Sequence, residues 1–396
     1  MTGRRIKLEE LFRIGSSKRV LQTQWTSYGV PFYRGREITR LAEDGFVDNE
    51  LFISEELFSE CRSKNGAPQA GDIMVTAIGT IGNSYVVRSD DRFYFKDASV
   101  LWLDRTADIS SEFINYWLKS PLFLDQLDRG NGATVDTLTI QKLQSVEVNV
   151  PSHSEQFRLV TILDEAFEGI ATAKANAEKN LRNAREVFSG EIERIFSSPE
   201  ISWRVVALSD IGRTQTGSTP KSAEPENLGV DVPFVKPGDF NRDGSINYDN
   251  DGLSETGAKK ARLIEAGSAL MVCIGATIGK AGYAERQIAT NQQVNSWTPF
   301  SDVLPKFIYY QMTSKDFQRR VVEGSGQATL PIINKSKWSS LRVAVPSTVN
   351  AQSKIVSDLD RLLEESMNLE VIYKRKLVAL TELKKSLLHR AFTGEL

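Results

Sequence analysis

Residues that commonly build metal or nucleophilic sites are scarce in this chain. Its 396 residues include two histidines, His153 and His389, and two cysteines, Cys61 and Cys273. The cysteines are isolated, without Cys-x-x-Cys spacing, and two separated histidines add no recognised set of metal ligands. We therefore expect no metal site, histidines that cap a helix or lie on the surface, and free thiols of the kind found in a reducing compartment.

Sequence motifs of the common catalytic sites are also missing. No GxSxG, HExxH or P-loop sequence occurs, and the Asn/Asp-Pro-Pro-aromatic tetrad of an amino-group DNA methyltransferase is absent. Carboxylates are plentiful, so the sequence does not exclude a nuclease site built from scattered acidic residues, although no spacing of these residues indicates one. We predict no catalytic residue in this chain.

Two glycine-rich segments have related sequences, Ile78-Gly-Thr-Ile-Gly82 and Ile274-Gly-Ala-Thr-Ile-Gly279. Neither matches the GxGxxG pattern of a dinucleotide-binding loop. Glycine permits a tight turn between two strands, and it also lets a backbone approach a ligand such as DNA closely. Because the segment occurs twice, both interpretations stay open.

These segments belong to an internal repeat with an offset of roughly 200 residues. Val30-Pro-Phe-Tyr33 corresponds to Val232-Pro-Phe-Val235, and Val146-Glu-Val-Asn-Val-Pro151 corresponds to Leu341-Arg-Val-Ala-Val-Pro346. Each copy has short β-branched and aromatic runs separated by Gly, Asn, Asp and Pro, which predict strands. Each ends in an alternating strand stopped by proline, and a long helix follows.

Both predicted helices have inward positions spaced by three and four residues for about five heptads, which is typical of a coiled coil. Forty-odd helical residues extend roughly 60 Å, more than a small domain spans, so we expect the helices to pack on each other rather than each on its own globular part. Polar Lys174, Ser366 and Lys376 would help to fix the register. In the first helix the inward positions are Val160, Leu163, Phe167, Ile170, Lys174, Ala177, Leu181, Ala184, Phe188 and Ile195. In the second they are Ile355, Leu359, Leu362, Ser366, Leu369, Tyr373, Lys376, Leu380, Leu383 and Leu387.

Composition is that of an ordinary globular protein, with 40% hydrophobic and 25% charged residues and a formal net charge of −2. The near-neutral charge counts against nucleic-acid binding, unless basic groups cluster locally or partner subunits contact the phosphates. No apolar run of membrane-spanning length occurs, and the first residues lack a signal-peptide pattern, so we expect a cytoplasmic protein.

We predict an α+β fold in which two similar mixed α/β domains alternate with two long helices that pair as an antiparallel coiled coil, with a pseudo-two-fold internal repeat. The predicted parts are residues 1–151 (first domain), 152–198 (first helix), 199–346 (second domain) and 347–396 (second helix).

This plan resembles the specificity subunits of type I restriction–modification systems. The resemblance covers essentially the whole chain and includes Thr290-Asn-Gln-Gln-Val-Asn295, Pro233-Phe-Val-Lys-Pro-Gly-Asp239 and the final segment from Leu383 to Leu396. The first domain departs from the pattern, with Phe95-Lys-Asp-Ala-Ser-Val100 where the second has Thr290–Asn295.

The resemblance implies a non-catalytic subunit that recognises a bipartite DNA sequence. Each domain would be a target-recognition domain that reads one half-site, and the helices would set the gap between the half-sites. Two methyltransferase subunits and two restriction subunits are the implied protein partners. S-adenosylmethionine, ATP and Mg are expected on those partners, and no cofactor is expected on this chain.

Base edges in the major groove are commonly read by Arg, Lys, Asn and Gln. We predict Arg34 and Arg36 in the first domain, and Lys236, Asn241 and Arg242 in the second, at the DNA face, because they follow equivalent strands. The further candidates are Lys18, Arg19, Lys221, Lys280, Gln292, Gln293 and Gln327.

We predict that the helices also dock the partner subunits. The residues assigned to helix pairing and docking are Leu163, Phe167, Leu181, Phe188, Leu359, Leu362, Leu369, Leu380, Leu383 and Leu387. Two alternatives stay open: a coiled-coil scaffold whose domains bind proteins, which the near-neutral charge would suit, and a stand-alone methyltransferase or nuclease.

Overall fold

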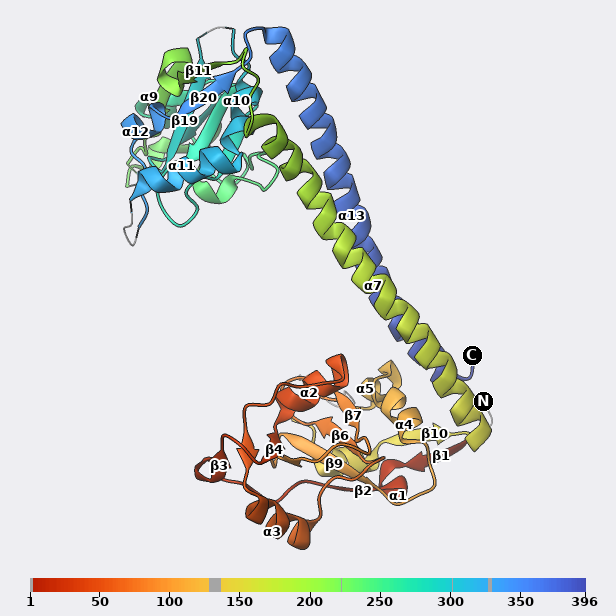
Figure 1. Cartoon of the computed structure of the whole chain (residues 1–396). Coiled ribbons are helices and arrows are strands. Elements are labelled where there is room, and N and C mark those ends of the chain that lie inside the picture. Colours follow the sequence, from red (N-terminus) through yellow and green to blue (C-terminus); the bar gives the residue numbers. More distant parts are fainter. Residues whose placement is uncertain (1–2, 128–136, 222, 301, 327–329) are drawn as a thin grey trace. The chain divides into compact units, whose positions relative to one another are not determined.

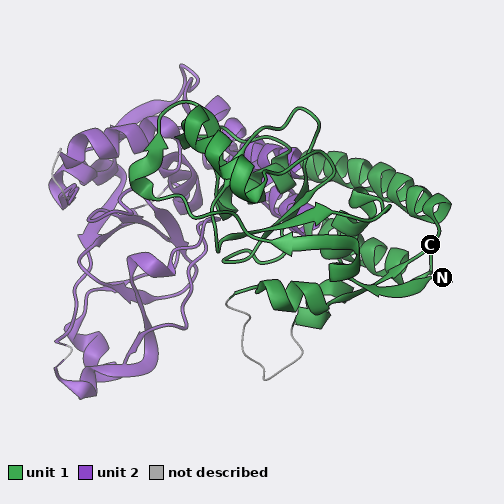
Figure 2. Ribbon diagram, turned by 90° about the horizontal axis from the view of Figure 1, so that it is seen from below, with its two compact units in different colours: residues 1–177, 376–396 green, residues 178–375 purple. Residues whose placement is uncertain are grey.

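The computed structural model describes residues 3–127, 137–221, 223–300, 302–326 and 330–396. The chain forms two compact units, residues 1–177 with 376–396 and residues 178–375 (Figure 2). Each unit contains one globular head and the parts of both long helices that belong to it. No helix in the described ranges is long and apolar enough to cross a membrane.

The head of unit 1 contains two four-stranded sheets and a separate strand pair (Figure 1). One sheet is antiparallel in the order β2-β9-β6-β7, and the other has the order β3-β5-β4-β8 with β4 and β8 parallel. β1 and β10 form the antiparallel pair. The strands are β1 Arg4–Lys7, β2 Phe12–Gly15, β3 Trp25–Thr26, β4 Val30–Tyr33, β5 Phe52–Ile53, β6 Ile73–Thr76, β7 Ser84–Val86, β8 Tyr94–Phe95, β9 Val100–Arg105 and β10 Glu147–Val150. The helices are α1 Leu8–Leu11, η1 Gln22–Gln24, α2 Gly35–Asp44, α3 Glu55–Asn65, α4 Ser111–Leu118, α5 Pro121–Leu127 and α6 Ile140–Ser145.

The head of unit 2 repeats this plan with the sheets β12-β19-β16-β17 and β14-β13-β18-β15 and the pair β11-β20. Here β13 and β18 are the parallel strands. The strands are β11 Arg204–Ala207, β12 Gly212–Thr216, β13 Leu228–Val235, β14 Gly252–Leu253, β15 Leu263–Ile264, β16 Ser268–Val272, β17 Ala281–Ala284, β18 Ile288–Thr290, β19 Val294–Pro299 and β20 Arg342–Val345. The helices are α8 Leu208–Ile211, η2 Pro225–Asn227, η3 Pro237–Asp239, α9 Glu255–Lys260, α10 Pro305–Met312, α11 Lys315–Ser325 and α12 Lys335–Ser339. The mixed α/β fold expected from the repeat is confirmed.

The heads differ after their equivalent strands β4 and β13. Unit 1 continues into the ten-residue helix α2, whereas unit 2 makes only η3, with Pro237 at its first position. A turn follows η3, closed by the bridge between Phe240 and Ile246, and Gly244 adopts a φ of 83° there. Such a positive φ favours glycine. One repeated position therefore supports two different local structures.

The long helices are α7, His153–Phe196, and α13, Val349–Thr393. In unit 1 they are antiparallel, because Arg158 near the start of α7 donates to the carbonyl of Leu396 at 2.7 Å, and Lys384 lies over the ring of Phe167. In unit 2 Arg185 of α7 pairs with Glu370 of α13 at 3.0 Å, and the Ser366 hydroxyl donates to the Ala184 carbonyl. The predicted pairing of the two helices is confirmed.

The register of α13 differs from the prediction in its second half. Leu369 and Leu383 were expected to face inward, but they are 42% and 46% exposed, and Lys376 is exposed as well. The half-buried positions are instead Glu370 and Leu377. After Ser366 the inward positions were expected at a step of three residues followed by a step of four. The structure has a step of four followed by a step of three, so the charged end of Lys376 lies in water.

In α7 the expected inward residues are buried or half-buried, except Lys174, which is exposed. Neither Lys174 nor Lys376 therefore fixes the register. Ser366 is 6% exposed and holds its predicted inward position. Arg185 and Glu370 form a charged contact between the helices in unit 2.

The end of one helix and the start of the other complete each head core. In unit 1 the core includes Leu163 of α7 and Phe392 of α13, whose ring lies 5.2 Å from that of Phe113. In unit 2 the core includes Leu359 of α13 and Phe196 of α7. Burial of these apolar residues holds the helices to each head.

Two polar contacts join head to helix in the same way in both units. Buried Gln156 and Gln352 each accept from a backbone N–H of the head, at Ser110 and Leu304, over 3.1 and 2.8 Å. The Tyr116 hydroxyl donates to Asp164 in unit 1, and the Tyr310 hydroxyl donates to Asp360 in unit 2. Because buried polar groups are stable when hydrogen-bonded, these contacts fix where each helix leaves its head.

We expect Gly190→Ala in α7 to stabilise unit 2. Apart from its chain neighbours and the adjacent backbone of its own helix, no described atom lies within 4 Å of the position that a Cβ would occupy there. Glycine inside a helix costs about 1 kcal/mol relative to alanine. The thermal midpoint of unit 2, measured by scanning calorimetry, should rise by about 2–4 °C. Gly217→Ala is the contrasting variant, because its Cβ would overlap the carbonyl oxygen of Asn291. A lower midpoint for Gly190→Ala would contradict the helical environment described.

Candidate nucleic-acid interface

The carboxyl ends of the parallel strands β4 and β8 form one edge in unit 1. β4 ends at Tyr33 and β8 at Phe95, and the Lys96 N–H donates to the Tyr33 carbonyl at 2.8 Å. Arg34 and Lys96 therefore lie side by side at this edge. The turn that begins at Ile78 lies beside it, since the Ala77 N–H donates to the Ser99 carbonyl at 3.0 Å.

Unit 2 repeats this edge at the ends of β13 and β18. The Asn291 N–H donates to the Val235 carbonyl at 3.3 Å, which sets Lys236 beside Asn291. The Cys273 N–H donates to the Gln293 carbonyl at 2.7 Å, and so the turn Ile274–Gly279 lies against this edge as well. We call these two regions the strand edges of unit 1 and unit 2.

A buried carboxylate fixes the basic residue at the edge of unit 1. Glu37 is 1% exposed and accepts from the Arg34 backbone N–H at 2.9 Å, the Arg34 guanidinium at 3.0 Å and the Arg36 Nε at 2.9 Å. Burial acts to raise the pKa of Glu37, but the hydrogen bonds from Arg34 and Arg36 outweigh it and lower the pKa to about 2. Arg34 is thereby held in one orientation.

The strand edge of unit 2 has the same arrangement. The Lys236 backbone N–H donates to buried Asp239 at 2.6 Å, three residues later, as Arg34 does to Glu37. The Lys236 ammonium pairs with Asp251 at 2.8 Å and lies 5.8 Å from the Phe234 ring centroid. Each head therefore presents a basic side chain whose backbone is anchored by an inner acid.

Amide side chains complete the edge of unit 2. The Oε1 of exposed Gln292 accepts from the Thr219 hydroxyl at 2.8 Å, which orients the amide and leaves its N–H donors available. Gln293 accepts from Asn291 at 2.9 Å and donates to the Ile274 carbonyl at 3.4 Å, so its amide joins two loops. Gln292 therefore suits base contact better than Gln293 does.

The remaining predicted residues are placed less uniformly. In unit 1, Arg36 also pairs with Glu50 at 3.2 Å, Lys18 pairs with Glu60 at 3.0 Å, and Arg19 is exposed. In unit 2, exposed Lys221 lies 3.7 Å from Glu224, and the Lys280 ammonium donates to the Phe240 carbonyl at 3.1 Å.

Asn241 and Arg242 lie apart from the strand edge of unit 2. They line a groove between this head and the helices, where Asn241 donates to the Ser245 hydroxyl at 3.0 Å. Gln327 lies outside the described residues.

Sequence reasoning missed two cations close to these edges. Lys96 follows β8 directly, as Asn291 follows the equivalent strand β18. Alignment of the two repeats at this position could have identified Lys96. The turn after β8 has one residue more than its equivalent, and Ala98 adopts a φ of 61° within it. Arg262 donates to the Thr216 carbonyl at 3.0 Å, and no repeat or motif indicated it.

The two glycine-rich segments form tight turns, which is the structural interpretation of their glycines. Gly79, Gly82, Gly275 and Gly279 all have φ values between 79° and 102°, a region that favours glycine. At Gly79 no atom of the described residues, apart from the two chain neighbours, lies within 4 Å of the position that a Cβ would occupy. Both interpretations therefore remain compatible with this turn.

The histidines and cysteines form no metal cluster in the described ranges. His153 begins α7 and lies 3.4 Å from Asp108, and His389 is exposed on α13. Cys61 and Cys273 are buried free thiols, and burial raises the pKa of Cys273 to about 12.

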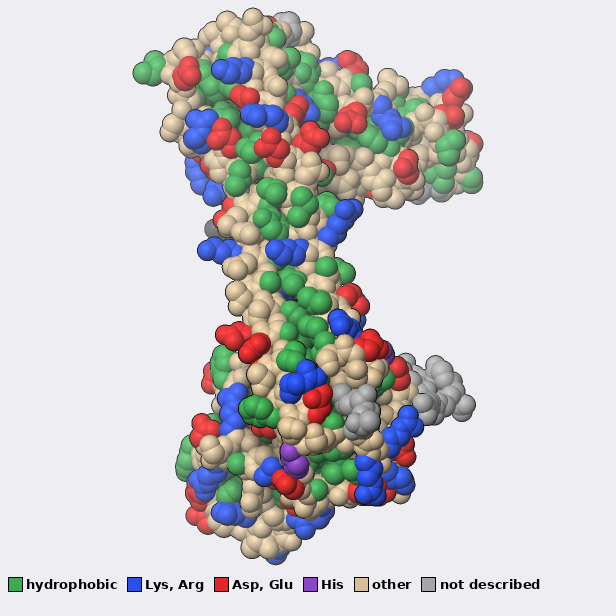
Figure 3. Space-filling model, turned by 90° about the vertical axis from the view of Figure 1, so that its right-hand side faces the viewer, with side chains coloured by type: hydrophobic (Ala, Val, Ile, Leu, Met, Phe, Trp, Pro, Cys, Tyr) green, Lys and Arg blue, Asp and Glu red, His purple; other side chains and the backbone are tan. Residues whose placement is uncertain are grey.

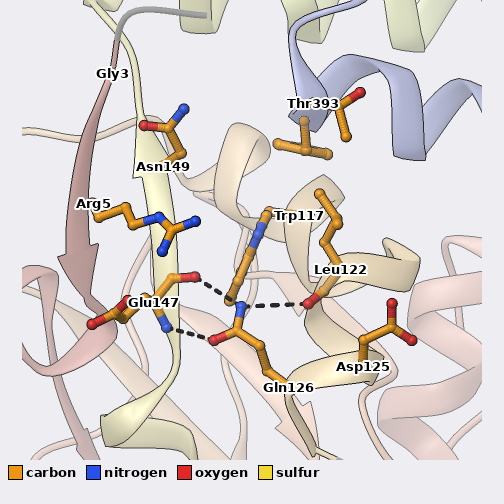
Figure 4. A pocket seen from close by; sticks show the side chains of 10 residues that line it. Gly3, Arg5, Trp117, Leu122, Asp125, Gln126, Glu147, Asn149 and Thr393 are labelled. Atoms are coloured by element: carbon orange, nitrogen blue, oxygen red, sulfur yellow. Dashed lines mark hydrogen bonds between the residues drawn. The ribbon is translucent and has the colours of Figure 1, made fainter.

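The cavity in Figure 4, of about 590 Å³, contains none of the predicted DNA-binding residues. It lies between β1, β10, α5 and the end of α13, and Gln126 exchanges two 2.9 Å hydrogen bonds with the Glu147 backbone there. Gly3 lines it, whereas the equivalent residue of unit 2, Trp203, packs on Phe196 and Phe307. The cavity therefore reflects an aromatic side chain that only one repeat has.

We expect Glu37→Gln to destabilise unit 1 in a pH-dependent way. The pKa of Glu37 is about 2 in the folded chain against an ordinary value of 4.5, so its stabilisation is complete above 4.5 and is lost as the pH falls toward 2. Urea unfolding of both proteins should therefore give a gap near neutral pH that closes across this window. Glu43→Gln, at an exposed position of the same helix, is the control. A gap that does not vary with pH would refute the assigned role of Glu37.

Comparison with known proteins identifies a family. The model for the type I restriction modification DNA specificity domain matches residues 4–181 and again 200–374. The HindI specificity subunit of a type I restriction enzyme from Haemophilus influenzae is 32% identical over 201 residues, which are 49% of this chain and 42% of that subunit. The chain spans less than half the length of the first curated relatives that it matches.

Solved structures show the same fold. The HsdS subunit from Thermoanaerobacter tengcongensis superposes with a TM-score of 0.64 at 15% identity, over 99% of this chain and 97% of that one. A chain from a structure on complex assembly and conformational transition of the type I R-M system gives a TM-score of 0.79 at 15% identity, over 100% and 99%. Two repeats of one matched domain, each with a head and a long helix, place this chain in the type I restriction modification DNA specificity family.

Proposed function

We propose that this chain is the DNA-recognition subunit of a type I restriction–modification complex, and that each strand edge reads one half of a bipartite site. The observation that carries the proposal is the repeated edge itself. Arg34 and Lys236 occupy equivalent places, each anchored through its backbone N–H by a buried acid three residues later. Side chains held in one orientation suit the recognition of base edges.

The chemistry of the two edges fits major-groove readout. Arginine and lysine donate to guanine O6 and N7, and amides pair with adenine, each good bidentate pair discriminating by about 1–3 kcal/mol. Unit 1 offers Arg34, Arg36 and Lys96, and unit 2 offers Lys236 and Gln292. The two edges therefore differ in the donors that they present, as two unlike half-sites would require.

The long helices would set the gap between half-sites and dock two methyltransferase subunits. Support for docking comes from exposed apolar side chains, which on a helix indicate an interaction surface when they cluster. In unit 2, Leu369 and Ile372 lie on one face of α13 and are 42% and 55% exposed, whereas Met367 and Val371 line the groove beside the head. Hydrophobic side chains also gather over the helices in Figure 3.

In the complex that we propose, bond chemistry belongs to the partners. S-adenosylmethionine would bind the methyltransferase subunits, and ATP and Mg would serve two restriction subunits, in the cytoplasm. The alternative of a protein-binding scaffold is favoured by one observation, the net charge of −2. Salt-dependent, sequence-selective binding of a bipartite duplex by the assembled complex would distinguish the two.

Replacement of an edge residue should weaken DNA binding. We expect Lys236→Ala, and separately Arg34→Ala, to lower the affinity of the assembled complex for its cognate duplex about tenfold or more, because a base or phosphate contact is lost. The measurement is a titration of cognate and scrambled duplexes at several salt concentrations. Lys354→Ala, at an exposed residue of α13, is the control. Wild-type affinity and salt dependence in both edge variants would reject the assignment.

Docking predicts a different pair of outcomes. Leu369→Asp adds a charge at an exposed site, so we expect an unchanged thermal midpoint and weaker co-purification of the methyltransferase partner. Leu380→Asp buries a charge at a half-buried position of the helix pair, so the midpoint itself should fall. Full partner recovery by a folded Leu369→Asp chain would remove this residue from the docking surface.

A further inference from the structure

Three lysines of unit 1 surround the place where its head meets the helices. Lys119 caps the C-terminus of α4, Lys174 lies on α7, and Lys384 lies on α13. The Lys384 ammonium lies 4.9 Å from the Phe167 ring centroid, and that ring packs edge-on against Tyr116 of α4 at 5.4 Å. Lys384 therefore reaches from its helix to the end of α4 that Lys119 caps. We call this region the junction of unit 1.

These lysines have no carboxylate partner in the part of the chain that the structure describes. None of their three ammonium groups forms an ion pair with any described residue, although Glu43 at the end of α2 acts on Lys384 through its charge. Burial, and then the charge of Lys384, lower the pKa of Lys119 to about 8. Burial and the charge of Lys174 lower the pKa of Lys384. Lys119 is half-buried, whereas Lys174 and Lys384 are exposed. Like charges grouped in this way repel one another, and a bound anion would relieve that repulsion.

The corresponding region of unit 2 is a groove of about 490 Å³ between α7, α13 and the turn at Asn241–Asp243. We call it the junction of unit 2. Two of its cations, Arg185 and Lys374, share Glu370 at 3.0 and 3.4 Å. The side chains of Arg242 and Lys315 have no carboxylate partner among the described residues. Glu193 and Asp243 line the groove as well, and Glu193 accepts from the Lys315 backbone N–H at 2.5 Å. Together with Glu370 they leave one net positive charge among the four cations of the groove. Both junctions therefore carry an excess of positive charge, supplied by different residues.

Each junction continues directly from a strand edge. In unit 1, α2 begins beside Arg34 at the edge and ends at Glu43 and Asp44, near Lys384. In unit 2, the segment from Lys236 to Arg242 connects the edge to the groove. Ten helical residues span about 15 Å, and the major groove of DNA is about 12 Å wide. A head whose edge occupies the groove would bring its junction to the flanking backbone.

From this continuity we propose that the two junctions are phosphate-binding surfaces, separate from the strand edges, that grip the sugar–phosphate backbone of the same duplex. The proposal rests on the proposed function. The junctions contribute affinity that is independent of sequence, whereas the edges contribute discrimination. The lysines of unit 1 and the pair Arg242 and Lys315 of unit 2 are the residues that carry this contribution.

The test uses full-length chain co-purified with its native partner subunits. One variant combines Lys119→Gln, Lys174→Gln and Lys384→Gln, and a second combines Arg242→Gln and Lys315→Gln. The control combines Lys7→Gln, Lys354→Gln and Arg361→Gln, which removes the same charge as the triple variant away from both junctions. Binding of cognate and scrambled duplexes is measured across a series of salt concentrations.

We expect both junction variants to bind cognate and scrambled DNA more weakly by the same factor, so that their ratio stays at the wild-type value. The salt slope should fall by about 0.9 for each lost phosphate contact, while the control keeps the wild-type slope. A wild-type slope in both junction variants would overturn the inference. Loss of partner subunits with DNA affinity retained would also overturn it, because the cations would then bind an acidic protein surface. Failure of the wild-type complex to select a bipartite duplex would instead reject the proposed function.

Discussion

The burial of helix ends in the two head cores is the constraint on which the rest of the structure depends. Unit 1 requires Phe392, from the end of α13, against Phe113, and unit 2 requires Phe196, from the end of α7, against Phe307. The ring centroids lie 5.2 and 5.3 Å apart, so the two contacts are nearly identical. Since each helix begins at one core and ends in the other, neither head completes its core from its own segment alone. This exchange makes pairing of the helices part of folding each head.

The two repeats agree where head joins helix and differ where a ligand would bind. Gln156 and Gln352 accept equivalent backbone bonds, and each head tyrosine donates to an aspartate of the helix that follows it. The strand edges, by contrast, carry Arg34 and α2 in one unit and Lys236 with η3 in the other. The edge segments pack in hydrophobic clusters other than the two that the helix ends complete, so an edge can differ between the repeats without disturbing the helices.

Much of this arrangement could be predicted from sequence because it depends on patterns. The repeat offset and the spacing of apolar residues predicted two similar heads and two paired helices. The register of α13 could not be predicted in this way. After Ser366, a step of three leads to Leu369 and a step of four leads to Glu370, and both fit a heptad pattern. Only the fold shows that Arg185 pairs with Glu370 and so places Glu370 inward. Lys96 was missed because the extra residue at Ala98 obscures its match to Asn291.

Near-neutral charge and the DNA contact proposed for the strand edges are compatible once the partners of each cation are considered. Buried Glu37 binds Nε and Nη2 of Arg34, so Nη1 is the guanidinium nitrogen that has no bond to this carboxylate. Glu50 and Asp251 have side chains that are 75% and 46% exposed, so Arg36 and Lys236 are able to exchange those carboxylates for a phosphate or a base. Each exchange gains less than a free cation would, because one ion pair is broken as another forms. The net charge therefore understates the cations that are available for contact, and their ion pairs orient them in the chain without ligand.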